Sequence, residues 1–189
     1  GGCWRETLEY LEQPMMLNLE AEAMDLSADF SGADVLYLDE SLLTEPSWDT
    51  AARQIMDFTK AGGAVLVPNA FSGAFPAEYL GASDFEPLTF REEIVLPAGL
   101  GDLSDLQGLI ADFHALYKGF TDYETLKGRD YGVAMVPDTA VPLVLSDDGG
   151  LALYAVNRWG EGAVLFTNPL LPNGYVQGDL SMAPRDLSQ

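Results

Sequence analysis

The alternation of apolar and polar residues predicts a strand, a helix and a second strand in the first third of the chain. Residues 33–38 form a nearly continuous apolar run, which is typical of a strand buried on both faces. Thr44 is a candidate N-cap, Pro46 stands in the first turn, and an apolar stripe follows on one helical face: Trp48, Ala51, Ala52, Ile55 and Phe58. The apolar run 64–67 comes next, so we expect a βαβ unit with two parallel strands.

Weaker patterns on either side of this unit predict a helix, an edge strand and an irregular segment. Residues 4–13 carry apolar side chains at helical spacing, and residues 17–23 alternate in the manner of an edge strand. Residues 68–103 are rich in Gly, Pro and Phe and contain one brief strand-like stretch, 93–96. We therefore interpret residues 68–103 as an irregular excursion from the sheet.

A second helix and a series of short strands are predicted for the rest of the chain. Ser104 and Gln107 have the spacing of a capping box, and an apolar stripe continues from them to Lys118. The strand-like segments that follow are short and apolar: 133–136, 141–145, 151–156 and 163–167. The last two flank the turn-like residues 157–162, which include two glycines, and so they predict a terminal hairpin.

Three segments resemble one protein superfamily: the strand 32–38, the helix-to-strand join 58–67 and the hairpin 156–166. They are similar to class I glutamine amidotransferase-like domains. Within that superfamily they resemble the non-catalytic branch found in bacterial surface proteins and beside glycosidase barrels, as in the trimerisation domain of certain β-galactosidases. The resemblance extends over roughly residues 17 to 170. The residues that carry the resemblance, Asp34, the Gly62–Gly63 pair and the Gly-x-Gly of the hairpin, have structural roles. The resemblance therefore bears on fold more than on function.

The resemblance implies an α/β fold, namely a flavodoxin-like three-layer sandwich. Such a fold has a mostly parallel sheet with helices on both faces, here with a C-terminal β-hairpin. One domain is expected over residues 1–170, and residues 171–189 are expected to form a tail or a linker to a following region. The superfamily's first strand, which should precede the opening helix, has no counterpart in the sequence. Either that strand lies upstream in a larger protein or another segment replaces it.

Charge restricts the partners that the protein can bind. The 189 residues include 30 Asp and Glu against 9 Lys and Arg, which gives a net charge of −21. Binding to nucleic acid depends on Lys and Arg at the phosphates, so we expect no nucleic acid partner. No apolar run reaches the roughly 18 residues of a membrane span, and we expect no membrane insertion. The acidity fits an extracellular or cell-surface location, with a cytoplasmic location as the alternative.

The catalytic groups of an active amidotransferase have no match in the sequence. Such an enzyme needs a cysteine on a glycine-flanked elbow and a His–Glu pair that activates it. The only thiol, Cys3, precedes the resembling region, and the only imidazole, His114, lies inside the second predicted helix. A single cysteine also excludes an internal disulfide and a multi-thiolate zinc site. We therefore predict no catalytic residue, no metal site and no cofactor.

Polar residues after the two parallel strands are the candidates for ligand binding. Asp39 and Glu40 follow the first strand and Asn69 follows the second, at the edge where open α/β sheets usually bind ligands. Their oxygens suit a hard cation, although solvation or capping of the next turn is the simpler explanation. Trp159, in the predicted hairpin turn, is a candidate for contact with a carbohydrate or a partner domain.

Together these features favour a non-catalytic accessory module of a larger bacterial, extracellular and carbohydrate-related protein. The module would dock against sibling domains of the same polypeptide or complete a homo-oligomer. Two alternatives stay open. One is a hydrolase or metal-dependent enzyme at the carboxyl edge of the sheet, and the other is a small-molecule or sugar-binding sensor domain.

Overall fold

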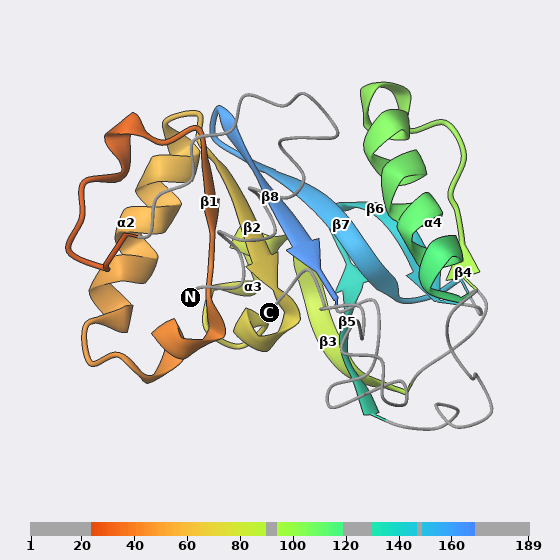
Figure 1. Ribbon diagram of the computed structural model, residues 1–189, viewed down its shortest axis with the longest axis horizontal. Helices are drawn as coiled ribbons and strands as arrows, with labels where there is room; N and C mark the ends of the chain where they lie inside the picture. Colours follow the sequence, from red (N-terminus) through yellow and green to blue (C-terminus); the bar gives the residue numbers. More distant parts are fainter. Residues whose placement is uncertain (1–23, 90–93, 119–129, 147–148, 169–189) are drawn as a thin grey trace.

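The structure is a computed structural model that describes residues 24–89, 94–118, 130–146 and 149–168 (Figure 1). In these ranges the strands form one open, mixed sheet that is flanked by helices. The helix predicted over 4–13, the edge strand predicted over 17–23 and the tail 171–189 lie outside the described residues.

The predicted βαβ unit is confirmed in its elements. β1 (Val35–Tyr37) pairs in parallel with β2 (Ala64–Pro68). They are connected by the 3-10 segment η2 (Glu40–Thr44) and by α2 (Trp48–Lys60), whose apolar stripe faces the sheet. One expectation is wrong: β1 is not buried on both faces, because it lies at an edge of the described sheet and Val35 is 55% exposed.

The start of α2 also differs from the prediction. Thr44 is the last residue of η2, and its hydroxyl donates to the carbonyl oxygen of Ser41 at 2.8 Å, so Thr44 does not cap α2. Ser47 takes the N-cap position without a side-chain hydrogen bond, and Pro46 therefore precedes the helix. The physical reason is that η2 packs two leucines, Leu42 and Leu43, against the core, which keeps it a separate turn.

The end of α2 is the one that the sequence Lys60-Ala61-Gly62-Gly63 predicts, since glycine can adopt a left-handed C-cap. Gly62 has a φ of 120°, in the region that favours glycine. The N–H groups of Gly62 and Gly63 donate to the carbonyl oxygens of Thr59 and Phe58, at 3.0 and 3.1 Å. This is the hydrogen-bond pattern of a Schellman motif, and it leads the chain directly into β2.

The remaining strands make the sheet mixed, not mostly parallel as expected. Their bounds are β3 (Ala82–Thr89), β4 (Ile94–Val95), β5 (Asp130–Pro137), β6 (Val141–Ser146), β7 (Ala152–Trp159) and β8 (Gly162–Thr167). The strand order is β1-β2-β8-β7-β5-β3, with β6 paired to β7 and β4 paired to β6. Among the described strands only β1–β2 and β2–β8 are parallel pairs, and the others are antiparallel.

The predicted irregular excursion over 68–103 contains regular structure. A short helix, α3 (Ala77–Leu80), leads into β3, which pairs with β5. Periodicity does not reveal β3 because its register with β5 shifts near both ends and because Pro87 interrupts it. A proline is tolerated in this strand since β3 ends the described strand order. The brief strand expected at 93–96 is present as β4.

The second predicted helix is α4 (Ser104–Lys118), but its predicted capping box is wrong. The side-chain amide of Gln107 donates to the carbonyl oxygens of Pro97 and Leu143, at 2.9 and 2.8 Å. Gln107 therefore ties α4 to β6 and to the segment after β4. Figure 1 shows α4 over β6, at the opposite end of the sheet from α2.

Alternate side chains of the central strands belong to two separate apolar clusters. Val164 and Phe166 of β8 join the cluster that includes residues of α2 and α3. Ala163 and Leu165 join the cluster that includes Leu106 of α4. Because successive side chains of a strand point to opposite faces, the two clusters lie on opposite faces of β8.

The predicted terminal hairpin is formed by β7 and β8, with a tighter turn than expected. Trp159 pairs with Gly162, so only residues 160–161 form the loop. The tip lies against the end of α2, because the N–H of Glu161 donates to the carbonyl oxygen of Lys60 at 3.1 Å. The approach is close: a Cβ on Gly162 would lie 2.2 Å from the carbonyl oxygen of Thr59.

Candidate functional site

Asp39 lies where the sequence places it, directly beyond β1, and its side chain caps the turn that follows it. It is the N-cap of η2, and its carboxylate accepts hydrogen bonds from the hydroxyl and the backbone N–H of Ser41, at 2.6 and 2.9 Å. These two bonds, the hydroxyl first, hold the pKa of Asp39 below its usual value. Glu40 is exposed in the first turn of η2, and η2 packs beside the 3-10 segment η3 (Asn69–Phe71).

Asn69 is buried at the start of η3, at the carboxyl end of β2. A second buried asparagine, Asn168, lies beside it, because Pro68 of β2 and Thr167 of β8 are partners in the parallel register. The structure therefore brings Asp39, Glu40 and Asn69 to the same edge of the sheet and adds Asn168 to them. This edge is the carboxyl end of the parallel strands, as the sequence predicts.

Trp159 lies away from this group. It ends β7 opposite Gly162, the first residue of β8, and thus lies at the amino end of the parallel strands. Its ring is half-buried and meets the ring of Tyr79 edge-on, with centroids 5.4 Å apart. Ring contacts continue from Tyr79 through Phe75 to Trp48, so the Trp159 ring is one end of an aromatic row in the core.

Tyr79 and Thr59 form a buried polar contact in the middle of this row. The two hydroxyl oxygens are 2.7 Å apart, and the Thr59 hydroxyl also lies 2.8 Å from the carbonyl oxygen of Ile55. Burial raises the pKa of Tyr79 to about 12, against the smaller opposing effect of its bond to Thr59. The phenol is therefore held neutral, and it serves packing.

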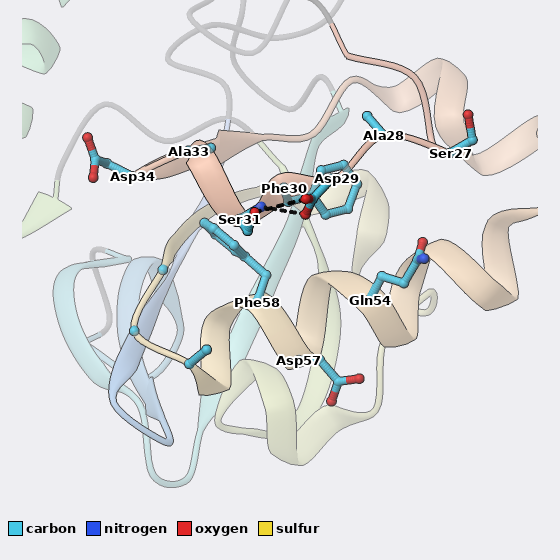
Figure 2. A pocket seen from close by; sticks show the side chains of 13 residues that line it. Ser27, Ala28, Asp29, Phe30, Ser31, Ala33, Asp34, Gln54, Asp57 and Phe58 are labelled. Carbon is cyan, nitrogen blue, oxygen red and sulfur yellow. Dashed lines mark hydrogen bonds between the residues drawn. The ribbon is translucent and has the colours of Figure 1, made fainter.

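A shallow groove of about 870 Å³ lies between α2 and the segment that precedes β1 (Figure 2). Its apolar part is formed by Phe30 and Phe58, whose rings meet edge-on at 6.5 Å. Three carboxylates also line it: Asp29, Asp34 and Asp57. No lysine or arginine is among the described residues that line the groove, so the local charge disfavours anions.

The carboxylates of the groove do not converge on one point. In Figure 2 the side chains of Asp34 and Asp57 point away from each other, on different sides of the two rings. Asp29 accepts hydrogen bonds from the backbone N–H and the hydroxyl of Ser31, which lower its pKa. Within the described ranges, no three side chains of His, Cys, Asp or Glu are grouped in a way that could hold a metal ion.

The structure does not place the side chains of the sequence's single cysteine and single histidine. Cys3 lies outside the described residues, and His114 is described only as part of the α4 backbone. Of the helices that are described, none has both the length and the apolar character needed to cross a membrane.

Sequence reasoning missed Asn168 and the groove. Asn168 follows β8 as Asn69 follows β2, and this repeated strand-to-asparagine step was the available signal. It was not decisive, because the parallel pairing of β2 with β8 joins segments almost 100 residues apart. The groove has no signal of its own, since Asp29, Asp34 and Asp57 come from separate elements in an acidic chain.

Comparison with known proteins yields structural neighbours only, since no family model and no curated protein matches the chain. The chain is similar to the β-galactosidase from Bacillus circulans sp. alkalophilus, with a TM-score of 0.48 and 15% identity over 79% of this chain and 22% of that one. It is similar to the cold-adapted β-galactosidase from Rahnella sp. R3, with a TM-score of 0.47 and 15% identity over 80% and 23%.

A third neighbour is a GH42 β-galactosidase, with a TM-score of 0.41 and 12% identity over 76% of this chain and 20% of that one. The chain spans about a fifth of the length of these three structures. Likeness at this level assigns no activity to the chain.

Proposed function

We propose that the chain is a non-catalytic, amidotransferase-like accessory module of a larger bacterial protein that is extracellular and carbohydrate-related. It acts by docking against sibling domains of the same polypeptide or against a second copy of itself. The sequence resemblance over residues 17 to 170 motivates the family and the location. A flavodoxin-like, three-layer arrangement of the whole domain is part of the same proposal.

The observation that carries the proposal is that two of the predicted ligand residues, Asp39 and Trp159, make contacts within the fold. The carboxylate of Asp39 accepts both hydrogen bonds that Ser41 offers, and the ring of Trp159 packs on Tyr79. Both side chains stabilise local structure, as expected of a scaffold that functions by docking through its outer surface. A ligand site would instead direct such groups into a shared cavity.

Exposed apolar side chains on the outer elements support docking. Four apolar side chains are exposed in this part of the chain. Val95 ends β4 and Leu96 follows it, Leu109 lies on α4, and Val141 begins β6. Single exposed apolar residues are ordinary on soluble proteins, but these four occur on elements that adjoin one another at one end of the sheet. This end of the sheet is therefore the surface that docks against another protein in this proposal.

Calorimetric titration separates this proposal from a metal-dependent enzyme. Calcium, magnesium and manganese, each at millimolar concentration, should give no saturable heat with the full chain. A one-to-one binding isotherm that disappears in Asp39→Ala, and persists in the exposed-carboxylate control Glu86→Ala, would support the enzyme instead. Hydrolase activity that is lost in Cys3→Ala or His114→Ala would likewise refute the non-catalytic reading.

A further inference from the structure

The groove between α2 and the segment before β1 is built around two aromatic rings (Figure 2). Phe58 of α2 and Phe30 of the 3-10 segment η1 (Phe30–Gly32) are both half-buried, and their rings meet edge-on with centroids 6.5 Å apart. The Phe58 ring lies directly on Gly63, because a Cβ at Gly63 would overlap the ring. The fold therefore holds both rings in place as part of the groove lining.

Three carboxylates give the groove a negative charge. Asp29, Asp34 and Asp57 are exposed and line it, and the described lining residues include no lysine or arginine. Asp29 accepts hydrogen bonds from the backbone N–H and the hydroxyl of Ser31, at 3.0 and 2.9 Å, which fix its carboxylate beside the rings. The whole chain carries a charge of −21, so the field around the groove attracts cations.

The arrangement suits an elongated cation better than a compact one. In Figure 2 the side chains of Asp34 and Asp57 point away from each other, so they are not placed to share one ion. The groove has a volume of about 870 Å³ and is shallow. A small molecule in it would keep much of its surface in water, whereas pockets for small molecules usually bury roughly 70–90% of the ligand. An extended chain with several separate cations fits this shape.

We propose that this groove binds an extended, lysine-rich segment of a partner protein. The lysine ammonium groups pair with the three carboxylates, and the apolar stems of the lysine side chains lie on the Phe30 and Phe58 rings, which also attract cations. An extended peptide advances about 3.3 Å per residue, so four lysines span about 13 Å and can reach separate carboxylates. The groove and α4 lie at opposite ends of the sheet, so this second surface does not depend on docking at β4 and α4 (Figure 1).

A titration followed by nuclear magnetic resonance on the full chain, labelled with ¹⁵N, tests the site. The probe is a peptide of four lysines with acetylated and amidated ends, and spermine, which also carries four positive charges, is the comparison. At about 20 mM NaCl the peptide should bind with a Kd below about 1 mM. The amide signals of Gly62 and Gly63 in the groove should move more than those of Gly99 and Gly101, which precede α4. No saturable shift, or spermine binding as tightly as the peptide, overturns the proposal.

Charge-matched variants test where the peptide binds. Asp34→Asn combined with Asp57→Asn should weaken binding about tenfold, since each lost exposed ion pair costs roughly threefold. Glu86→Gln combined with Asp138→Asn removes the same charge from exposed positions on β3 and after β5, and should weaken binding less than about twofold. Equal weakening in the two double variants would show a response to net charge alone and contradict the groove site.

A third variant tests the aromatic part of the groove. Phe58→Leu keeps the charge and an apolar side chain but removes the ring, and should weaken peptide binding about two- to fivefold. Unchanged affinity in folded Phe58→Leu contradicts the role of the ring. If Phe58→Leu does not fold, the two double variants, whose substitutions are all at exposed positions, still decide whether the groove is the site.

Discussion

At the scale of single residues, the buried Tyr79–Thr59 contact predicts a specific loss of stability at alkaline pH. Burial raises the pKa of Tyr79 to about 12, from an ordinary value of about 10. The neutral phenol is therefore favoured in the folded state, and its contribution is complete below about pH 10 and is lost as the pH rises to about 12. Two pKa units correspond to roughly 2–3 kcal/mol.

Urea unfolding of wild type and Tyr79→Phe at several pH values measures this effect. At pH 7 the variant should be less stable by about 0.5–1.5 kcal/mol, because it lacks one buried hydrogen bond. Between pH 10 and 12 the wild type should lose up to roughly 2–3 kcal/mol that the variant keeps, so the two midpoints converge and then cross. A difference that stays constant over this range would show that Tyr79 does not titrate as described.

A second residue-scale prediction concerns Asp39. Asp39→Ala removes the cap of η2 and should destabilise the protein by about 0.5–2 kcal/mol at pH 7. Because Ser41 lowers the folded pKa of Asp39, this stabilisation is present above about pH 4 and is lost as the pH falls through the lower folded value. Chemical denaturation at pH 7 and in acid checks both parts. Glu86→Ala removes an equally negative but exposed side chain and should change little.

At the scale of elements, the joint between the β7–β8 hairpin and α2 should tolerate no added atom. In Gly162→Ala the new Cβ would lie 2.2 Å from the carbonyl oxygens of both Gly63 and Thr59. Backbone must move to relieve this clash, and we expect a loss of about 1–3 kcal/mol in the free energy of unfolding. Gly73→Ala is the matched control, because nothing lies within 4 Å of its new Cβ. Equal midpoints for the two variants would contradict the close packing.

The elements that the sequence predicts best are those whose signals are local. The apolar stripe of α2, the Gly62–Gly63 ending and the β7–β8 hairpin depend on neighbours in the chain, and all three are present. β3 was missed because its regularity comes from pairing with β5, more than 40 residues away, and its own pattern is broken by Pro87 and by register shifts. The mixed sheet was missed for the same reason.

At the scale of the whole molecule, the net charge of −21 sets how any association responds to salt. Two copies of the chain repel each other, and salt screens this repulsion over about 10 Å at 0.1 M. Self-association should therefore strengthen between about 20 and 500 mM NaCl, whereas docking to a basic sibling domain should weaken. Sedimentation velocity at both salt concentrations distinguishes the two partners. Self-association that weakens as salt is added would contradict the role assigned to charge.

The candidate site could be predicted only in part, because its members are brought together by tertiary pairing. Asp39, Glu40 and Asn69 were found from their positions after parallel strands, and they do share one edge. Trp159 was expected in the hairpin turn but ends β7 and packs on Tyr79. Asn168 needed the β2–β8 register, and the use of Asp39 as a cap needed the hydrogen bonds of Ser41.

The most direct test of the docking role is sedimentation velocity of the chain, alone and mixed with the remainder of the larger polypeptide to which the proposal assigns it. Concentrations from about 1 to 300 µM cover the range of weak and strong association, which corresponds to roughly 5–8 kcal/mol of binding free energy. We predict a concentration-dependent increase in sedimentation coefficient in at least one of the two samples. A chain that sediments as a monomer throughout, both alone and in the mixture, would contradict the proposal that it is a docking module.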